Sequence, residues 1–520
     1  MNDNLRRLPR NYSMLTDWYE FSMNDAYVEA NKENEEVVFD VFFRKIPNDG
    51  GYAIMAGVDK LIEYIKNLRF DSVEDQEYLR NQGLSEKHLE LLKNFKFHGD
   101  IKAIPDGTPV FPNEPLVTVR APLYEAAVIE TAILSLLNGS MEHATGARRV
   151  IEATPKNVPV MEFGARRADG FEAAIDSSIY GVMAGCCGTS NAIAAQMMNQ
   201  KALGTMAHHF IETFDDELDA FKAYARTYPN NAILLVDTYD TLRSGVPNAI
   251  KTFDYMKENG LPTNNIGIRI DSGDLAYLSK ESRKMLNEAG YEQAKICLSN
   301  GLNARVIDAL LDQGAVFDSL GVGDNISKPE GRMGCVYKEV ALKTNDTWEP
   351  KIKLSNDRIK IVNPGYKKLY RAYDNETGYA LADVMAIKDE EIMQEYNLIC
   401  DFIKLRDELT IVSVTDNLKS TTIKNFELVE LQKTIFKNGE LVYDDPEIME
   451  KRTYCNEQMK TLYPEVKRTT MPHEYYVDGT EEYVELKDDM IEKAKELVRK
   501  WYYGKKGSRG ISPSVSKNNW

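Results

Sequence analysis

AILLVDT (232–238) opens the stretch of sequence that decides the fold of this chain. Three similar runs follow it, IGIRID (266–271), KICLSN (295–300) and FDSLGVG (317–323), and VPVMEFG (158–164) precedes it. Each run is short and apolar at consecutive positions, which is typical of a strand that is covered on both faces. Helical patterns separate the runs, so the segment predicts parallel strands joined by βαβ crossovers. Five or six such units favour a barrel or near-barrel, and an open doubly wound sheet is the alternative.

Residues 1–145 show a different pattern and predict a separate N-terminal α/β domain. VVFDVFF (37–43) is rich in β-formers, and the proline-dense stretch 106–123 predicts short antiparallel strands. EAAVIETAILSLLN (125–138) predicts an apolar helix.

The remaining boundaries follow from changes in composition. We expect a barrel-like domain over 146–355, a C-terminal region over 356–503 that packs on the N-terminal domain and helps to complete it, and a disordered tail over 504–520. A late helix should dock on the main body through an apolar stripe made of Met490, Ile491, Ala494, Leu497, Val498 and Trp501.

Two helices between the central strands can be placed from their spacing. In 212–227 one face carries Phe214, Leu218, Phe221 and Ala225. Another helix is expected over 303–313, with Gly314 at its C-terminal cap and Pro247 in the first turn of an earlier helix.

The composition excludes several classes of protein. The 520 residues carry 64 Lys+Arg against 81 Asp+Glu, a formal charge of −17, which argues against binding to nucleic acid or to an anionic membrane. Hydrophobic residues make up 43% and charged residues 28%, as in folded globular chains. With no long apolar run, no secretory signal and six sparse cysteines, we expect a cytoplasmic protein without disulfides or a structural metal.

Polar residues follow each of the expected central strands, where parallel α/β proteins place their ligands. GVGDN (321–325) has two glycines whose backbone N–H groups could hold a phosphate. DSGD (271–274) could hold ribose hydroxyls or Mg²⁺ through water, or it could form a turn and cap the next helix.

Basic residues form small clusters in this acidic chain, and guanidinium groups bind phosphate oxygens in a bidentate manner. The pairs are Arg166-Arg167, Arg148-Arg149 and Arg44-Lys45. Arg269 interrupts an apolar strand, so its charge must be paired or face a ligand. GTMAHHF (204–210) could present a histidine nucleophile at a strand end. The chain has neither a P-loop nor a G-x-S-x-G elbow.

Taken together and in order, the motifs of residues 12–375 resemble those of the nicotinate phosphoribosyltransferase family. The similar segments are MLTDWYEFSM (14–23), FDVFFRKIP (39–47), EFGARRADG (162–170), GTSNAIAA (188–195), GTMAHHF (204–210), LLVDTYDTLRSGVPNAI (234–250), IRIDSGDL (268–275), SNGLN (299–303), FDSLGVGDN (317–325) and KLSNDRIKIVNPGYKKLYR (353–371).

The resemblance implies an N-terminal α/β domain, an incomplete TIM-like (β/α) barrel, and a homodimer with shared active sites. It also implies a reaction: nicotinate and 5-phosphoribosyl 1-pyrophosphate give nicotinate mononucleotide and pyrophosphate, the first step of NAD biosynthesis from nicotinate. ATP hydrolysis would be coupled to this ligase-like step through a phosphohistidine. Mg²⁺ would be held mainly through the substrate phosphates.

The resemblance also assigns residues to the nicotinate ring and to ATP. Tyr19 would pack on the ring from the partner subunit, and Phe163 would stack on its other face. Thr205 and Arg269 would hold the nicotinate side, and His208 would be phosphorylated, although His209 stands beside it.

A second set is assigned to the phosphoribosyl group. Arg166 would hold phosphate, Asp271 would hold the ribosyl moiety, and Gly321 and Gly323 would lie at the 5-phosphate. Asp324 stands where many relatives have threonine, and its carboxylate would have to face Mg²⁺ or solvent.

Three alternatives stay open. Nicotinamide phosphoribosyltransferases carry an acid where GTSN has Ser190, which suits an anionic substrate better. Quinolinate phosphoribosyltransferases are shorter and lack the phosphohistidine segment. A barrel that senses nucleotides without turnover is the third alternative, although His208 and Arg269 are both present.

Overall fold

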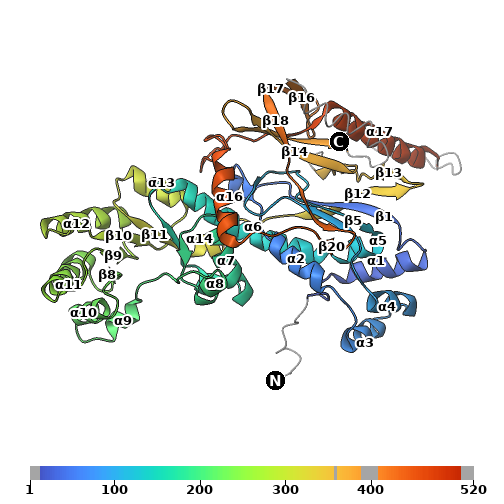
Figure 1. Ribbon diagram of the computed structural model, residues 1–520. Helices are drawn as coiled ribbons and strands as arrows, with labels where there is room; N and C mark the ends of the chain where they lie inside the picture. The colour runs from blue at the N-terminus through green and yellow to red at the C-terminus, as the bar shows by residue number, and fades with distance from the viewer. Residues whose placement is uncertain (1–11, 356–359, 388–407, 505–520) are drawn as a thin grey trace, which may run out of the picture.

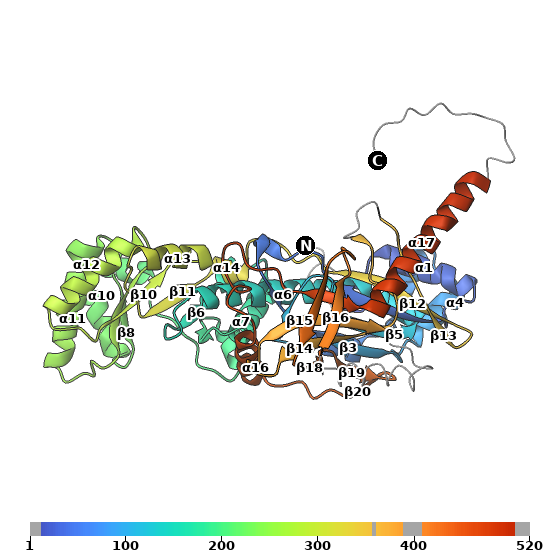
Figure 2. The ribbon, with the colours of Figure 1, turned by 90° about the horizontal axis from the view of Figure 1, so that it is seen from above.

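The computed structural model describes residues 12–355, 360–387 and 408–504. A parallel sheet flanked by helices lies at one end of the molecule, and two further sheets lie at the other (Figure 1). The long helix α6 (Glu130–Ala153) runs between these two parts (Figures 1 and 2).

The parallel sheet has six strands in the order β7-β6-β11-β10-β9-β8, and every neighbouring pair is parallel. Its strands are β6 (Val160–Glu162), β7 (Gly188–Thr189), β8 (Ala232–Leu235), β9 (Ile266–Ile270), β10 (Lys295–Ser299) and β11 (Ser319–Val322). Within the described ranges no pairing joins the outer strands β7 and β8, so the barrel is a half-barrel. The prediction of a parallel α/β segment is therefore confirmed. Of the two architectures considered, the structure has the incomplete barrel and not the open doubly wound sheet.

Helices connect these strands in the expected alternation. They are α7 (Phe171–Met183), α8 (Ala192–Met197), α9 (His208–Glu212), α10 (Glu217–Thr227), α11 (Val246–Glu258), α12 (Leu275–Glu288), α13 (Ala304–Asp312) and the single turn α14 (Asp324–Ser327). Gly314 follows α13 with φ 72°, and Pro247 lies in the first turn of α11, as predicted. The prediction of one helix over 212–227 is wrong at its start, because α10 begins only at Glu217. The Asp216 carboxylate accepts a hydrogen bond from the Leu218 N–H and caps the helix there.

The N-terminal segments contribute β1, β3 and β5 to a seven-stranded antiparallel sheet, the N-terminal sheet, in the order β13-β12-β1-β5-β3-β19-β20. Its strands are β1 (Glu36–Phe42), β3 (Asp100–Ala103), β5 (Val117–Pro122), β12 (Val336–Thr344), β13 (Thr347–Pro350), β19 (Lys433–Lys437) and β20 (Glu440–Leu441), while β2 (Ala53–Ile54) pairs with β4 (Pro109–Val110). This sheet thus takes strands from four distant parts of the chain.

Helices α1 (Trp18–Glu29), α2 (Val58–Asn67), α3 (Val73–Asn81) and α4 (Glu86–Lys93) belong to this N-terminal part. The apolar helix expected over 125–138 is two helices, α5 (Leu123–Val128) and the longer α6. They meet at Ile129, which is the C-cap of one and the N-cap of the other.

The C-terminal segments form a second six-stranded sheet, in the order β17-β16-β21-β15-β14-β18. Its elements are β14 (Lys367–Asp374), β15 (Ala380–Ile387), β16 (Glu408–Ser413), β17 (Ser420–Lys424), β18 (Phe426–Glu430) and β21 (Val477–Thr480), with helices α16 (Ile448–Lys460) and α17 (Glu481–Gly504).

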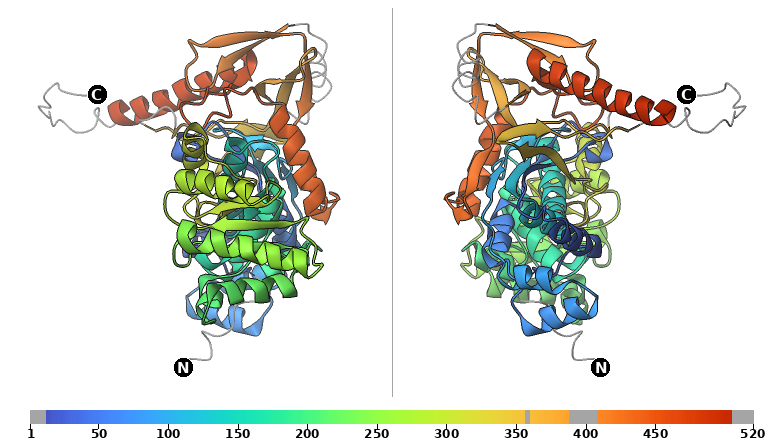
Figure 3. Two further views of the ribbon diagram at one scale, coloured as in Figure 1. Left: turned by 90° about the vertical axis from the view of Figure 1, so that its left-hand side faces the viewer. Right: turned by 90° about the vertical axis from the view of Figure 1, so that its right-hand side faces the viewer.

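Only the first half of α17 docks on this sheet. Tyr483, Val484 and Ile491 are buried, whereas Leu497 and Val498 are 65% and 61% exposed. The stripe predicted to dock over its whole length is therefore wrong in its second half, where the helix extends away from the sheets (Figures 2 and 3). The tail predicted to be disordered lies, apart from Gly504, outside the described residues.

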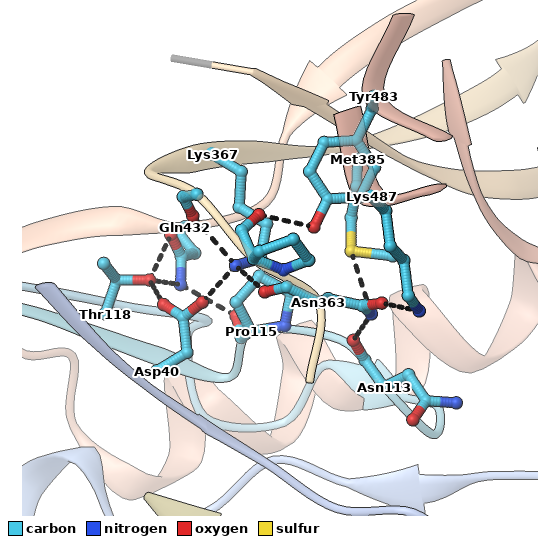
Figure 4. A network of polar contacts seen from close by, with 12 residues as sticks. Asp40, Asn113, Pro115, Thr118, Asn363, Lys367, Met385, Gln432, Tyr483 and Lys487 are labelled. Carbon is cyan, nitrogen blue, oxygen red and sulfur yellow. Dashed lines mark hydrogen bonds and ion pairs between the residues drawn. The ribbon is translucent and has the colours of Figure 1, made fainter. Parts of the chain in front are cut away.

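Buried polar side chains join the N-terminal sheet to the C-terminal one (Figure 4). Lys367 Nζ on β14 donates to Asp40 on β1 at 2.5 Å and to the Asn363 carbonyl at 2.9 Å. Lys487 Nζ on α17 donates to Asn363 Oδ1 at 2.7 Å. Because both lysines are buried, these bonds fix how the two sheets sit on each other.

Two further findings concern the described residues alone. None of their helices combines the length and apolarity needed to cross a membrane. Their five cysteines are free thiols, four of them buried, while Cys400 lies outside the described ranges.

Candidate functional site

The carboxyl ends of β8, β9 and β10 bring three polar segments together. Asp271, directly after β9, accepts a hydrogen bond from Ser299 Oγ at the end of β10, at 2.5 Å. Asp237, after β8, accepts from the Asp271 N–H at 3.2 Å and from Ser272 Oγ at 2.5 Å. The other oxygen of Asp237, Oδ1, is buried and has no partner among the described residues. Two carboxylates thus lie at one edge of the sheet, where parallel strands bind ligands.

Arg269 lies on β9, two residues before Asp271. Its neighbours across the sheet are Leu235 of β8 and Cys297 of β10. One terminal nitrogen donates to Thr205 Oγ1 at 2.8 Å, while the buried Nε has no partner in the described part of the chain. A guanidinium with an unused buried donor is suited to an anionic ligand.

His208 stands at the start of α9, and the run before it has no regular secondary structure. The expectation that it follows a strand is therefore wrong. Its Nδ1 lies 3.1 Å from Thr238 Oγ1, and its Nε2 lies 3.9 Å from Asp271 Oδ2. Its side chain is 39% exposed, whereas that of His209 is exposed and makes no hydrogen bond within the described ranges.

Phe163 follows β6 and lies against β11. Its N–H donates to the Val322 carbonyl at 2.7 Å, and a Cβ added to Gly321 would lie 2.6 Å from two carbons of its ring. Gly321 is thus needed here to make room for an aromatic ring. Gly323 has the unusual angles φ −108° and ψ −93° and forms the N-cap of α14.

Arg166 and Arg167 lie in the short 3-10 helix Ala165–Arg167 after β6, and both are exposed. Arg167 Nε lies 3.3 Å from Asp324 Oδ1, and each of these side chains is 60% exposed. Asp324 therefore faces solvent and a neighbouring guanidinium. The pairing leaves Arg166 as the arginine of this turn with no ion pair to a described residue.

Further cations line a depression beside this turn, with Arg167 and Asp324 in its wall. Lys328 Nζ lies 2.7 Å from Asp169, and Arg332 lies 2.8 Å from the buried Glu142. Each of these cations has a carboxylate partner, so the depression carries balanced charge, and Asp324 and Glu330 also line it.

The Glu162 side chain stabilises the turn that carries Phe163 and Arg166 through hydrogen bonds. This carboxylate is fully buried and accepts hydrogen bonds from Ser178 Oγ at 2.9 Å, from Thr189 Oγ1 at 2.5 Å and from the Gly164 N–H. Burial raises the pKa of Glu162, while these three donors lower it. Glu162 is a positioning residue, because its bonds fix the turn and the neighbouring strand β7.

Tyr19 is not part of this cluster. It lies on α1 in the N-terminal part, far from the half-barrel strands, and its side chain is 46% exposed (Figure 1). Burial and neighbouring carboxylates raise its pKa to about 12. Within one chain, the structure therefore brings together Thr205, His208, Arg269 and Asp271, and places Phe163, Gly321, Gly323, Asp324 and Arg166 around the adjoining turn.

Four residues of this region escaped the sequence reasoning: Glu162, Asp237, Thr238 and Ser299. All four stand at or just after the ends of central strands, which is the signal that could have identified them. The sequence alone does not show which of them bond to Asp271 or His208, because those contacts join segments about 30 residues apart.

No group of three or more His, Cys, Asp or Glu residues suited to a metal ion occurs in the described part of the chain. The pair Asp237 and Asp271 is compatible with Mg²⁺, which binds one or two carboxylates together with substrate phosphates.

The chain matches two family models. Residues 14–138 match the nicotinate phosphoribosyltransferase (NAPRTase) N-terminal domain, and residues 366–487 match the nicotinate phosphoribosyltransferase C-terminal domain.

Curated relatives cover nearly the whole chain. A nicotinate phosphoribosyltransferase of Bacillus subtilis is 37% identical over 94% of this chain and 96% of its own length. One from Caenorhabditis elegans is 31% identical over 90% of this chain and 91% of its own. The crystal structure of human nicotinic acid phosphoribosyltransferase has the same fold, with a TM-score of 0.77 and 24% identity over 91% of this chain and 99% of that one.

Proposed function

The chain belongs to the nicotinate phosphoribosyltransferase family, and from this premise we propose that it joins nicotinate to 5-phosphoribosyl 1-pyrophosphate, giving nicotinate mononucleotide and pyrophosphate. The observation that carries the proposal is the guanidinium of Arg269, which has an unused buried donor at the ends of strands that also carry Asp271.

Nicotinate is a flat ring with a carboxylate. In our proposal, Arg269 and the Thr205 hydroxyl hold the carboxylate, since they already lie 2.8 Å apart. Phe163, whose ring rests on Gly321, offers a flat apolar face for the pyridine ring.

The bond-forming step requires little acid–base chemistry. The ring nitrogen already has a lone pair, which attacks C1 of the ribosyl group as the bond from C1 to pyrophosphate breaks. Asp271 faces the positive charge that develops on the sugar, and Arg166 and the N–H groups of the Gly-Val-Gly turn stabilise the phosphates.

We further propose that ATP hydrolysis is coupled to this reaction through His208. The contact between Nδ1 and Thr238 leaves Nε2 as the nucleophile. Nε2 attacks the γ-phosphorus of ATP, an N–P bond forms as the P–O bond to ADP breaks, and water later releases phosphate. Mg²⁺, held by Asp237 and Asp271 with the substrate phosphates, would neutralise phosphate charge.

A homodimer with shared sites accounts for Tyr19. Since Tyr19 lies far from Phe163 in its own chain, the partner subunit's Tyr19 would supply the second face of the nicotinate pocket.

One assay separates these proposals from their alternatives. The purified protein is supplied with 5-phosphoribosyl 1-pyrophosphate, Mg²⁺ and either nicotinate or nicotinamide, with and without ATP. We expect mononucleotide from nicotinate only, with ADP formed when ATP is present. Product from nicotinamide would favour the nicotinamide enzyme, and no product from either would favour a sensing protein.

His208→Ala tests the phosphohistidine, with His209→Ala as the matched control. Removal of a nucleophile typically costs roughly a thousandfold or more in rate. We expect His208→Ala to lose acid-labile ³²P labelling from [γ-³²P]ATP and His209→Ala to keep it. Labelling that persists in His208→Ala would contradict the assignment.

A further inference from the structure

A cavity of about 90 Å³ lies where α6, the start of α13, the loop after β1 and the segment after α16 meet. Its walls include Asn48, the segment 50–52, and the segments 303–305 and 467–469. None of the half-barrel residues assigned above to nicotinate, ATP or phosphoribosyl binding is among its lining residues. The cavity adjoins the depression beside the Gly-Val-Gly turn, because Pro329 and Glu330 line both, but its remaining walls belong to other segments.

The neighbouring residues Arg148 and Arg149 point in different directions at this cavity. Arg148 is buried and faces away from it, bonded to Glu152 and, at 2.6 Å, to Asn456 Oδ1. Arg149 lines the cavity and donates to the Pro47 carbonyl at 2.8 Å. A Cβ at Gly50 would collide with the Arg149 guanidinium, so the loop makes room for this group. The first arginine is structural, and the second is presented to the cavity.

The cavity has more positive than negative charge. Arg149, Arg305, Lys467 and Arg468 line it, and Glu330 is the one carboxylate among the lining residues. Lys467 lies 4.0 Å from Glu152 and Arg468 lies 3.4 Å from Glu465, whereas Arg149 and Arg305 form no ion pair with a described residue. Burial lowers the pKa of Arg149, Tyr52 raises it, and the positive charge of Arg305 lowers it.

The nine-residue helix α13 adds to this positive field. Asn303, its N-cap, and its first residues Ala304 and Arg305 line the cavity. The first N–H groups of a helix carry partial positive charge toward a ligand at this end.

We propose that this cavity binds a phosphate-sized oxyanion, either free inorganic phosphate or the phosphoryl group of a nucleotide. Such an anion would bridge Arg149 and Arg305 and remove their repulsion. The cavity has room for several water molecules, and therefore for one phosphoryl group.

The test uses the full chain, with inorganic phosphate and adenosine 5′-monophosphate as probes and sodium chloride at matched ionic strength as control. Binding is measured by calorimetry, and hydrogen exchange of residues 47–52 reports on this cavity. Arg305→Met removes an exposed charge without disturbing the fold, and Arg305→Glu supplies a carboxylate in place of the anion. Arg166→Met is the matched control in the strand-end site.

We expect phosphate to protect residues 47–52, both Arg305 variants to weaken this effect at least about tenfold, and Arg166→Met to leave it unchanged. A dissociation constant within twofold of the wild-type value in both Arg305 variants would overturn the proposal. Loss of protection in Arg166→Met would also overturn it, because the anion would then lie at the strand ends. The probe that binds more tightly identifies the source of the phosphoryl group.

Discussion

Cationic side chains have different kinds of partner in two regions of the molecule. Between the N- and C-terminal sheets, the buried cations Lys367 and Arg371 each have a carboxylate partner: Lys367 bonds to Asp40, and Arg371 bonds to Asp383 at 2.7 and 2.6 Å. At the half-barrel strand ends, Arg269 bonds only to a threonine hydroxyl among the described residues. The difference between the regions lies in the carboxylate partner, because Arg371 Nη1, like Arg269 Nε, is a buried donor with no partner among the described residues.

This difference corresponds to two roles of a charged side chain, which are to stabilise the fold and to bind a ligand. A charge paired within the protein stabilises one arrangement of elements, and removal of its partner leaves an uncompensated buried charge. A charge without a partner contributes little to folding but can bind an anion strongly when one arrives. Substitutions in the first region should therefore change stability, and those in the second should change substrate binding.

The largest effect is expected at Arg371. It is completely buried, lies 5.6 and 5.8 Å from the ring centres of Phe111 and Tyr475, and forms a bidentate pair with Asp383. Arg371→Met should lower the free energy of unfolding by about 3–5 kcal/mol, measured by urea denaturation. The double variant Arg371→Met/Asp383→Leu should recover part of the loss. If the single variant loses less than the double variant, the pair is not what stabilises this region.

Arg269→Ala should change substrate binding and leave the stability of the fold intact. Loss of a charge-assisted hydrogen bond to nicotinate should raise KM by roughly 10- to 100-fold. The melting temperature should stay the same or rise, because an unsatisfied buried donor is removed. Thr205→Val, which leaves the guanidinium in place, is the milder control. A KM for nicotinate that does not change in Arg269→Ala would remove this residue from the substrate site.

Tyr19 tests whether the second region is complete within one chain. Tyr19→Ala should lower activity about tenfold through loss of an aromatic contact. Mixed dimers of Tyr19→Ala and Arg166→Ala subunits should recover activity, because one of their two sites would then be intact. Failure of these dimers to exceed either parent would contradict the shared site.

The smallest effect is expected at Glu114, in the region between the N- and C-terminal sheets. Burial raises its pKa well above the ordinary value of 4.5, and Asp383 raises it further. Its protonated form therefore contributes stability that is complete below pH 4.5 and is lost as the pH rises through the raised pKa. Glu114→Gln keeps the shape and removes the titration, so stability should fall less with pH above 4.5 than in the wild type. A steeper fall in the variant would show that Glu114 is ionised in the native state.

The half-barrel could be predicted from sequence because its information is local. Each strand is a short apolar run with a helix after it, so periodicity alone identifies IGIRID and KICLSN. The strand-end rule then indicates Asp271 and Arg269 as candidates. The roles of individual residues came only from the resemblance, and they stay predictions.

The N-terminal sheet could not be predicted in this way. Its strand β3 pairs with β19, more than 300 residues later, and no local pattern specifies such a partner. For the same reason, the sequence did not show that Arg167 would pair with Asp324 or that Thr238 would lie against His208. Contacts between distant segments depend on tertiary packing, which a single sequence does not display.

The insertion of β19 into the N-terminal sheet has a consequence for biosynthesis. The half-barrel strands all lie between residues 160 and 322, so this part can assemble while the ribosome is still translating the rest. The sheet that begins at Glu36 keeps an open edge at β3 until Lys433–Lys437 emerges. During that interval the nascent chain exposes an unpaired strand, which makes this edge the place where a chaperone would be most useful.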